Sequence, residues 1–189
     1  MRLVVSVALV LLVACSGSSP NEAAKASAGD PFAVLRPVPL RIPQLPAGQP
    51  CPKDALRDPG AHLGTALGEG PVYAFGVNLH DLAGGHPSKV AWGAAPTYSG
   101  PVRVRGGRRD GIGRLLLESF DNRWRGKTVE TVDGSNLTSE LDLLVSHSTF
   151  PSAPAGWRVW PSATYIDMPG CYSWQVDGIG FTEVITVQV

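Results

Sequence analysis

Two groups of side chains in this sequence have types and spacings that could do chemistry, and the first is a loop with two histidines. His80, Asp81 and His86 lie close together in the segment NLHDLAGGHPSK. Imidazole and carboxylate groups are ligands for Zn²⁺ and also act as acids and bases in hydrolases. Their spacing matches no dedicated metal motif, and Gly84 and Gly85 between them indicate a loop. One interpretation of the loop is therefore a site for metal binding or hydrolysis. The competing interpretation is that these residues are solvated loop side chains.

The second group is a cluster of arginines. In PVRVRGG, strand alternation places Val102 and Val104 toward a core and Arg103 and Arg105 on the outer face. Guanidinium groups on one face could hold phosphate or carboxylate groups of an anionic lipid or a cell-envelope polymer. The competing interpretation is a solvated sheet face whose charges protect an edge, with acidic residues nearby. The candidate anion-binding patch consists of Arg103, Arg105, Arg108 and Arg109.

The sequence carries no recognisable catalytic or nucleotide-binding motif. It has no G-x-S-x-G nucleophile elbow, and the serines beside His147 alternate across a strand instead of converging in space. The segment GGRRDGIG lacks the pattern of a phosphate-binding loop. The 16 Lys and Arg residues balance 16 Asp and Glu residues, so nothing indicates a nucleic-acid partner. We therefore expect no enzyme activity, no cofactor and no metal.

The N-terminus has the pattern of an export signal. Arg2 precedes an apolar run that is too short to cross a membrane but suits a secretory signal. The run ends in LVAC, which resembles the lipobox of bacterial lipoproteins. That resemblance implies cleavage after residue 14 and lipidation of Cys15, placing the chain on the extracytoplasmic face of a bacterial membrane. An ordinary signal peptide with a chance cysteine is the alternative.

The remaining chain divides into a tether and one domain. Residues 15–50 are small, polar and proline-rich, which favours extended polyproline II conformation. Apolar residues among the prolines predict that the second half of this tether lies along the surface of the domain at residues 51–189. Cys51 and Cys171 are the two cysteines left after lipidation. In an exported chain they most simply form a disulfide, the alternative being two free thiols.

The domain is predicted to be all-β, because short runs with strand patterning recur between glycine-containing turn signals. Near the C-terminus, SATYIDM, CYSWQVDG and FTEVITVQV read as consecutive strands, the last two joined by an Asp177-Gly178 turn. Alternation places Tyr172 and Trp174 in the core and Cys171 on the opposite face. The prediction is an immunoglobulin-like antiparallel β-sandwich preceded by a signal peptide and a proline-rich tether.

The segments YSGPVRVRGGRRDG and WPSATYIDMPGCYSWQVDGIGFTEVI resemble a group of uncharacterised bacterial lipoproteins. The resemblance covers about the last half of the chain. It implies the location of the protein and its fold, and it implies no activity. The expected function is a membrane-anchored, non-catalytic interaction or envelope-associated module. Its expected partners are the membrane, through the lipid anchor, and an envelope polymer or protein.

Overall fold

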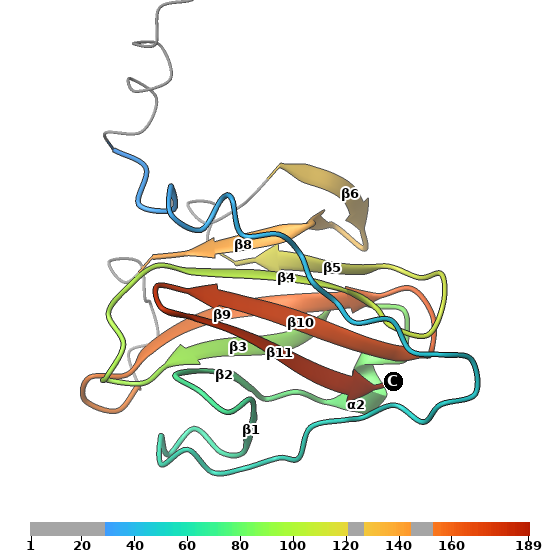
Figure 1. The fold of residues 1–189 in the computed structure, drawn as a ribbon, viewed down its shortest axis with the longest axis horizontal. Coiled ribbons are helices and arrows are strands. Elements are labelled where there is room, and N and C mark those ends of the chain that lie inside the picture. Colours follow the sequence, from blue (N-terminus) through green and yellow to red (C-terminus); the bar gives the residue numbers. More distant parts are fainter. Residues whose placement is uncertain (1–28, 121–126, 145–152) are drawn as a thin grey trace, which may run out of the picture. The chain divides into compact units, whose positions relative to one another are not determined.

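Two antiparallel β-sheets form the framework of the protein in a computed structural model (Figure 1). The structure describes residues 29–120, 127–144 and 153–189. One sheet has the strand order β1-β2-β3-β9-β5-β7-β6 and the other has the order β11-β10-β4-β8. The strands are β1 (Ala66–Leu67), β2 (Val72–Phe75), β3 (Ser88–Ala94), β4 (Val102–Arg108), β5 (Leu115–Ser119), β6 (Thr128–Val132), β7 (Ser135–Thr138), β8 (Glu140–Leu143), β9 (Arg158–Ile166), β10 (Cys171–Gly178) and β11 (Phe181–Gln188). The predicted all-β sandwich architecture is thereby confirmed.

The core lies between the two sheets and uses the faces that alternation assigns. Tyr172 and Trp174 of β10 are fully buried and stand opposite Val187 and Ile185 of β11. Trp92 of β3 meets Trp174 across the sandwich edge to face, with ring centroids 5.8 Å apart. Such aromatic pairs contribute beyond the area that they bury. The predicted inward face of the C-terminal strands is therefore correct.

The C-terminal hairpin turns two residues later than the sequence suggests. Gly178 pairs with Phe181, so the two-residue loop is Ile179 and Gly180, and Gly180 has a φ of 87° that suits glycine. The predicted Asp177-Gly178 turn is wrong, because both residues continue β10. A Cβ atom at Gly178 would overlap the Phe181 ring, so this glycine serves close packing within the hairpin.

Two strand-like runs predicted separately form one strand. The segments WRVW and ATYIDM are joined in β9, which runs through Pro161. Proline interrupts a ladder because it has no amide donor. β5 pairs with β9 only as far as Ser162, so Pro161 lies beyond that ladder and the strand can continue.

The compact unit begins at Pro31, well before the expected domain start at residue 51. Residues 31–57, hereafter the strap, pass over the outer face of the sheet that contains β4, β10 and β11 (Figure 1, blue to cyan). They then reach the edge of the other sheet, where Arg57 bridges to Ala66 of β1. The second half of the proline-rich segment therefore belongs to the folded unit and lies along its surface.

Helical structure is slight in the described residues. The helix α2 (Leu79–Leu82) is a single turn, begun by Asn78, whose side-chain oxygen accepts the His80 N–H at 3.1 Å. His80 and Asp81 therefore lie on this turn rather than in the predicted loop, while His86 follows it. No helix in the described part of the chain is long and apolar enough to cross a membrane.

Candidate functional site

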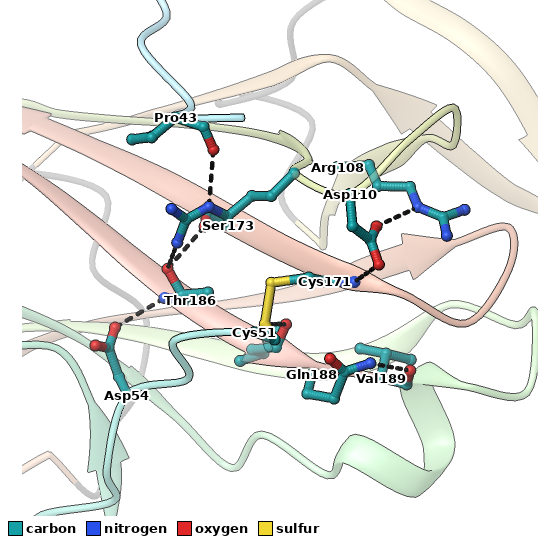
Figure 2. Close-up of a disulfide and its surroundings, with 12 residues drawn as sticks. Pro43, Cys51, Asp54, Arg108, Asp110, Cys171, Ser173, Thr186, Gln188 and Val189 are labelled. Atoms are coloured by element: carbon teal, nitrogen blue, oxygen red, sulfur yellow. Dashed lines mark hydrogen bonds and ion pairs between the residues drawn. A yellow bond between two sulfur atoms is a disulfide. The ribbon is translucent and has the colours of Figure 1, made fainter. Parts of the chain in front are cut away.

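The disulfide predicted from the cysteine count is present and joins Cys51 to Cys171 across 120 residues of sequence. Cys171 is buried on the outer face of β10, opposite Gln188 of β11, and Figure 2 shows Cys51 reaching it from the strap. The backbone N–H of Cys171 donates to the Asp110 carboxylate at 3.1 Å. The bond therefore fixes the strap, near its C-terminal end, to the first residue of β10.

The outer face of β10 is polar and nevertheless buried. Alternate residues along it are Cys171, Ser173, Gln175 and Asp177, each at most 1 % exposed. The strap passes over this face, and its backbone supplies the hydrogen-bond partners of Gln175. The Arg41 N–H donates to Gln175 Oε1 at 2.6 Å, and Gln175 Nε2 donates to the Pro39 carbonyl at 2.9 Å. A covered polar face of this kind is stable only when its groups find partners.

Asp177 is the centre of this buried network. It accepts from Arg105 Nη2 at 2.6 Å, from Gln175 Nε2 at 2.9 Å and from Thr182 Oγ1 at 2.8 Å. The same Arg105 nitrogen donates to the Val38 carbonyl of the strap at 2.9 Å. The carboxylate is fully buried but paired with a cation and hydrogen-bonded, which is the condition under which a buried charge is tolerated.

A second polar cluster holds the strap nearer to the disulfide. Arg109 Nε donates to the Pro43 carbonyl at 2.8 Å, and its Nη1 donates to Thr186 Oγ1 at 3.1 Å. Asp54 and Thr186 are joined twice: the Thr186 N–H donates to the Asp54 carboxylate, as Figure 2 shows, and the Asp54 N–H donates to the Thr186 carbonyl. The strap is thus attached to β11 on both sides of Cys51.

The four arginines of the candidate anion-binding patch are used within the protein. Arg105 and Arg109 hold the strap as described. Arg103 is 4 % exposed and lies 2.7 Å from the Glu140 carboxylate and 3.1 Å from that of Asp142, both on β8. Alternation placed these side chains on the outer face correctly, but the face is covered. The structure therefore gives no support to an open cationic surface at these residues.

Arg108 is also paired, with a different role. Its Nε donates to Asp110 at 2.6 Å, its Nη1 donates to the Ile112 carbonyl at 2.8 Å, and its guanidinium lies 5.7 Å from the centre of the Tyr172 ring. The hydrogen bond from Arg108 lowers the pKa of Asp110, and the Cys171 N–H acts in the same direction. The pair thus orders the β4–β5 turn beside the disulfide.

The histidine loop borders a cavity but does not assemble a metal site. His80, Asp81, His86 and Lys89 line a hollow of about 500 Å³. His86 Nδ1 lies 2.6 Å from the Asp133 carboxylate in the β6–β7 turn, so its nearest partner is a residue that sequence proximity did not suggest. Within the described ranges, no group of three or more His, Cys, Asp or Glu side chains is placed to hold a metal ion.

Glu183 is the charged side chain that strand alternation places on the core face of β11. Its carboxylate accepts the Glu69 N–H from the turn between β1 and β2, so it joins the edges of the two sheets. Burial raises the pKa of Glu183, although the backbone hydrogen bonds to its carboxylate act in the opposite direction. Glu183 therefore lies at the rim of the core, and no arginine pairs with it in the described ranges.

This raised pKa predicts a pH-dependent effect of Glu183→Gln. The folded chain keeps the Glu183 proton to a higher pH than the unfolded chain, so the native carboxyl favours folding most below its ordinary pKa. That advantage is lost as the pH rises through the folded pKa. The free energy of unfolding of the variant relative to the native chain should therefore increase as the pH rises above about 4, the ordinary pKa of a glutamate. Urea unfolding of both proteins at several pH values above about 4 measures this difference. If the two free energies of unfolding change with pH in parallel, the raised pKa of Glu183 is contradicted.

The sequence did not indicate Asp177 and Gln175 as central residues. The sequence pattern placed Asp177 in a turn and Gln175 on the outward face of a strand. The one usable signal was the run of alternate residues Cys171, Ser173, Gln175 and Asp177, which pairs a predicted disulfide cysteine with polar neighbours on one face. A covered cysteine implies that its neighbours on that face are covered as well.

Fold and site together define a class: a two-sheet antiparallel β-sandwich whose polar outer face is covered by a disulfide-linked strap. Comparison with protein-family models, curated proteins and solved structures finds no match for the chain. The predicted lipidation site, Cys15, lies outside the residues that the structure describes.

Proposed function

We propose that this protein is a membrane-anchored, extracytoplasmic lipoprotein whose folded unit is a non-catalytic, immunoglobulin-like interaction module. The observation that carries the proposal is the Cys51–Cys171 disulfide. Structural disulfides persist in oxidising compartments outside the cytoplasm, and this one follows a chain start that resembles a lipoprotein signal. Its partner is an envelope polymer or protein, and the lipid on Cys15 holds the chain to the extracytoplasmic face of the membrane.

The strand order supports the immunoglobulin-like part of the proposal. A constant-type immunoglobulin sandwich has strands A-B-E-D in one sheet and C-F-G in the other. β2, β3, β9 and β5 are neighbours in that order in one sheet, and β4, β10 and β11 are neighbours in the other. Given the letters A to G along the chain, these seven strands also follow the immunoglobulin sequence order. β6, β7 and β8 are then an insertion between D and E.

Two packing features support the same assignment. In antibody domains a disulfide joins strands B and F, and a tyrosine two residues before its second cysteine bonds to backbone upstream. Here Trp92 and Trp174 meet between the corresponding strands. Tyr172, two residues before Trp174, donates its hydroxyl proton to the Met168 carbonyl at 2.9 Å. Burial raises the pKa of Tyr172 to about 12, consistent with a hydroxyl held as a donor in the core.

The non-catalytic part of the proposal is supported by how the charged side chains are used. The arginines of the candidate patch bind carboxylates and strap carbonyls of the same chain. Asp177, the most buried carboxylate, is saturated by three donors and has no access to solvent. These groups stabilise the fold, and a non-catalytic interaction module does not require them to act on a substrate.

The proposed membrane location is tested by expressing the Cys15→Ser variant in a bacterial host. We expect the native chain to fractionate with membranes and to incorporate labelled palmitate, and the variant to lose both properties while remaining outside the cytoplasm. Both proteins should contain the Cys51–Cys171 disulfide, which thiol trapping under denaturing conditions reports. A native chain that is cytoplasmic, unlabelled and reduced would contradict the proposal.

A further inference from the structure

A cavity of about 520 Å³ opens at the edge of the sandwich, where the ends of β1 and β11 face each other beside α2. Its apolar lining consists of Leu56, Leu67, Val77, Leu79 and Val187. Its polar lining consists of Lys53, Asp54, Asn78, His80, Thr186 and Gln188. The volume lies within the usual range of small-molecule sites, which is roughly 300 to 1,000 Å³. We propose that this cavity binds an aliphatic carboxylate, independently of the proposed membrane address.

The strap creates the cavity by bridging the two sheet edges. Asp54 is bonded to Thr186 of β11, and three residues later Arg57 exchanges backbone hydrogen bonds with Ala66 of β1. The chain between these attachments spans the gap between the sheets without filling it. Leu56, in the middle of the bridge, is consequently held at the mouth of the cavity. Both ends of the bridge are fixed by hydrogen bonds, so the site is formed before a ligand arrives.

The lining favours an aliphatic ligand. Leu56 is 60 % exposed and Leu79 is 41 % exposed, and both line the cavity together with the buried Leu67 and Val187. Two exposed leucines facing one apolar hollow are costly in water and become buried when an aliphatic chain enters. No Trp, Tyr or Phe side chain lines this cavity, and its one ring is the imidazole of His80. A sugar would therefore lack the Trp or Tyr platform on which carbohydrates usually stack, whereas an aliphatic chain needs no such platform.

The rim supplies a charge for the head group. Lys53 has no ion pair with another described residue. Asp54 is the one acid in the lining, and its carboxylate already accepts the Thr186 N–H at 2.8 Å. The His80 ring, next to Leu79, adds a second polar group at the same opening. A ligand with an apolar body and a carboxylate end would place the body between the leucines and the carboxylate near Lys53.

The test uses the full chain carrying Cys15→Ser, so that no detergent competes for an apolar site. Decanoate, below its micelle concentration, is titrated by calorimetry, and one saturable site is expected. Leu56→Ser and Leu79→Ser should each weaken decanoate about tenfold, the loss expected when one leucine contact is removed. Lys53→Glu should weaken decanoate but leave decanol binding unchanged.

Matched variants away from the cavity control for general effects. Leu40→Ser removes a leucine that is 47 % exposed on another part of the strap, and Lys127→Glu reverses an exposed lysine before β6. Neither should change decanoate affinity, and all five variants should keep the native melting temperature because the side chains are exposed. Absence of a saturable site, or equal weakening by Leu40→Ser, would overturn the proposal. Decanol binding as tightly as decanoate would overturn the assignment of a carboxylate.

Discussion

Replacing Cys51 and Cys171 together by alanine is expected to lower the free energy of unfolding by about 4 to 5 kcal/mol in the chain-entropy account. The bond closes a loop of 120 residues, so its loss frees most of the folded unit in the unfolded state. That amount is a large share of the stability of an ordinary domain. Guanidinium unfolding of the oxidised native chain and the double variant measures the difference.

Two comparisons separate the disulfide from the strap contacts around it. Reducing the native chain should destabilise it about as much as the double substitution does. Asp54→Ala, which keeps the bond but removes one strap hydrogen bond to β11, should cost only about 1 kcal/mol. A double variant within about 1 kcal/mol of the native chain would contradict the chain-entropy expectation.

The second large effect is expected at Asp177. Asp177→Ala should destabilise the protein by about 3 to 5 kcal/mol, because it leaves Arg105 buried beneath the strap without its counter-charge. The variant also removes the acceptor for Gln175 and Thr182. Urea unfolding measures the loss, and hydrogen exchange of the Arg41 amide reports whether the strap loosens first.

A matched variant and a paired replacement test the cause. Asp110→Ala breaks a pair with Arg108 of similar length near the surface and also removes the acceptor of the Cys171 N–H, and should cost about 2 kcal/mol or less. Replacing the buried pair together, as Arg105→Met with Asp177→Leu, should recover much of the lost stability, since paired apolar substitution of a buried ion pair is often neutral. Equal losses in Asp177→Ala and Asp110→Ala would mean that burial does not decide the cost.

Both expected results depend on the proline-rich segment being part of the folded unit. The second half of this segment was expected to lie along the surface of the domain, and it belongs to the folded unit, which begins at Pro31. Prolines suit this position because an extended chain without amide donors can cross a polar face while offering its carbonyls. The carbonyls of Val38, Pro39 and Pro43 are the acceptors that Arg105, Gln175 and Arg109 use.

Several features could be predicted from the sequence because they depend on local pattern or on simple counting. Alternation along CYSWQV placed Tyr172 and Trp174 in the core and Cys171 outside it, as the structure has them. With one cysteine assigned to the lipid, the other two had only each other as partners. Recurrent short strands between turn signals were sufficient for an all-β sandwich, since strand period and turn chemistry are local properties.

Other features were decided only by the tertiary structure, because they depend on residues far apart in sequence. Asp177 continues a strand instead of turning, since Arg105, 72 residues away, and Thr182 bind its carboxylate. The arginines cluster in the sequence but find separate carboxylates and carbonyls, so a linear cluster does not become a cationic surface. The edge cavity exists because the strap crosses from one sheet to the other. Hydrogen-bonding groups must find partners wherever the fold brings them, and that pairing is not encoded in any short segment.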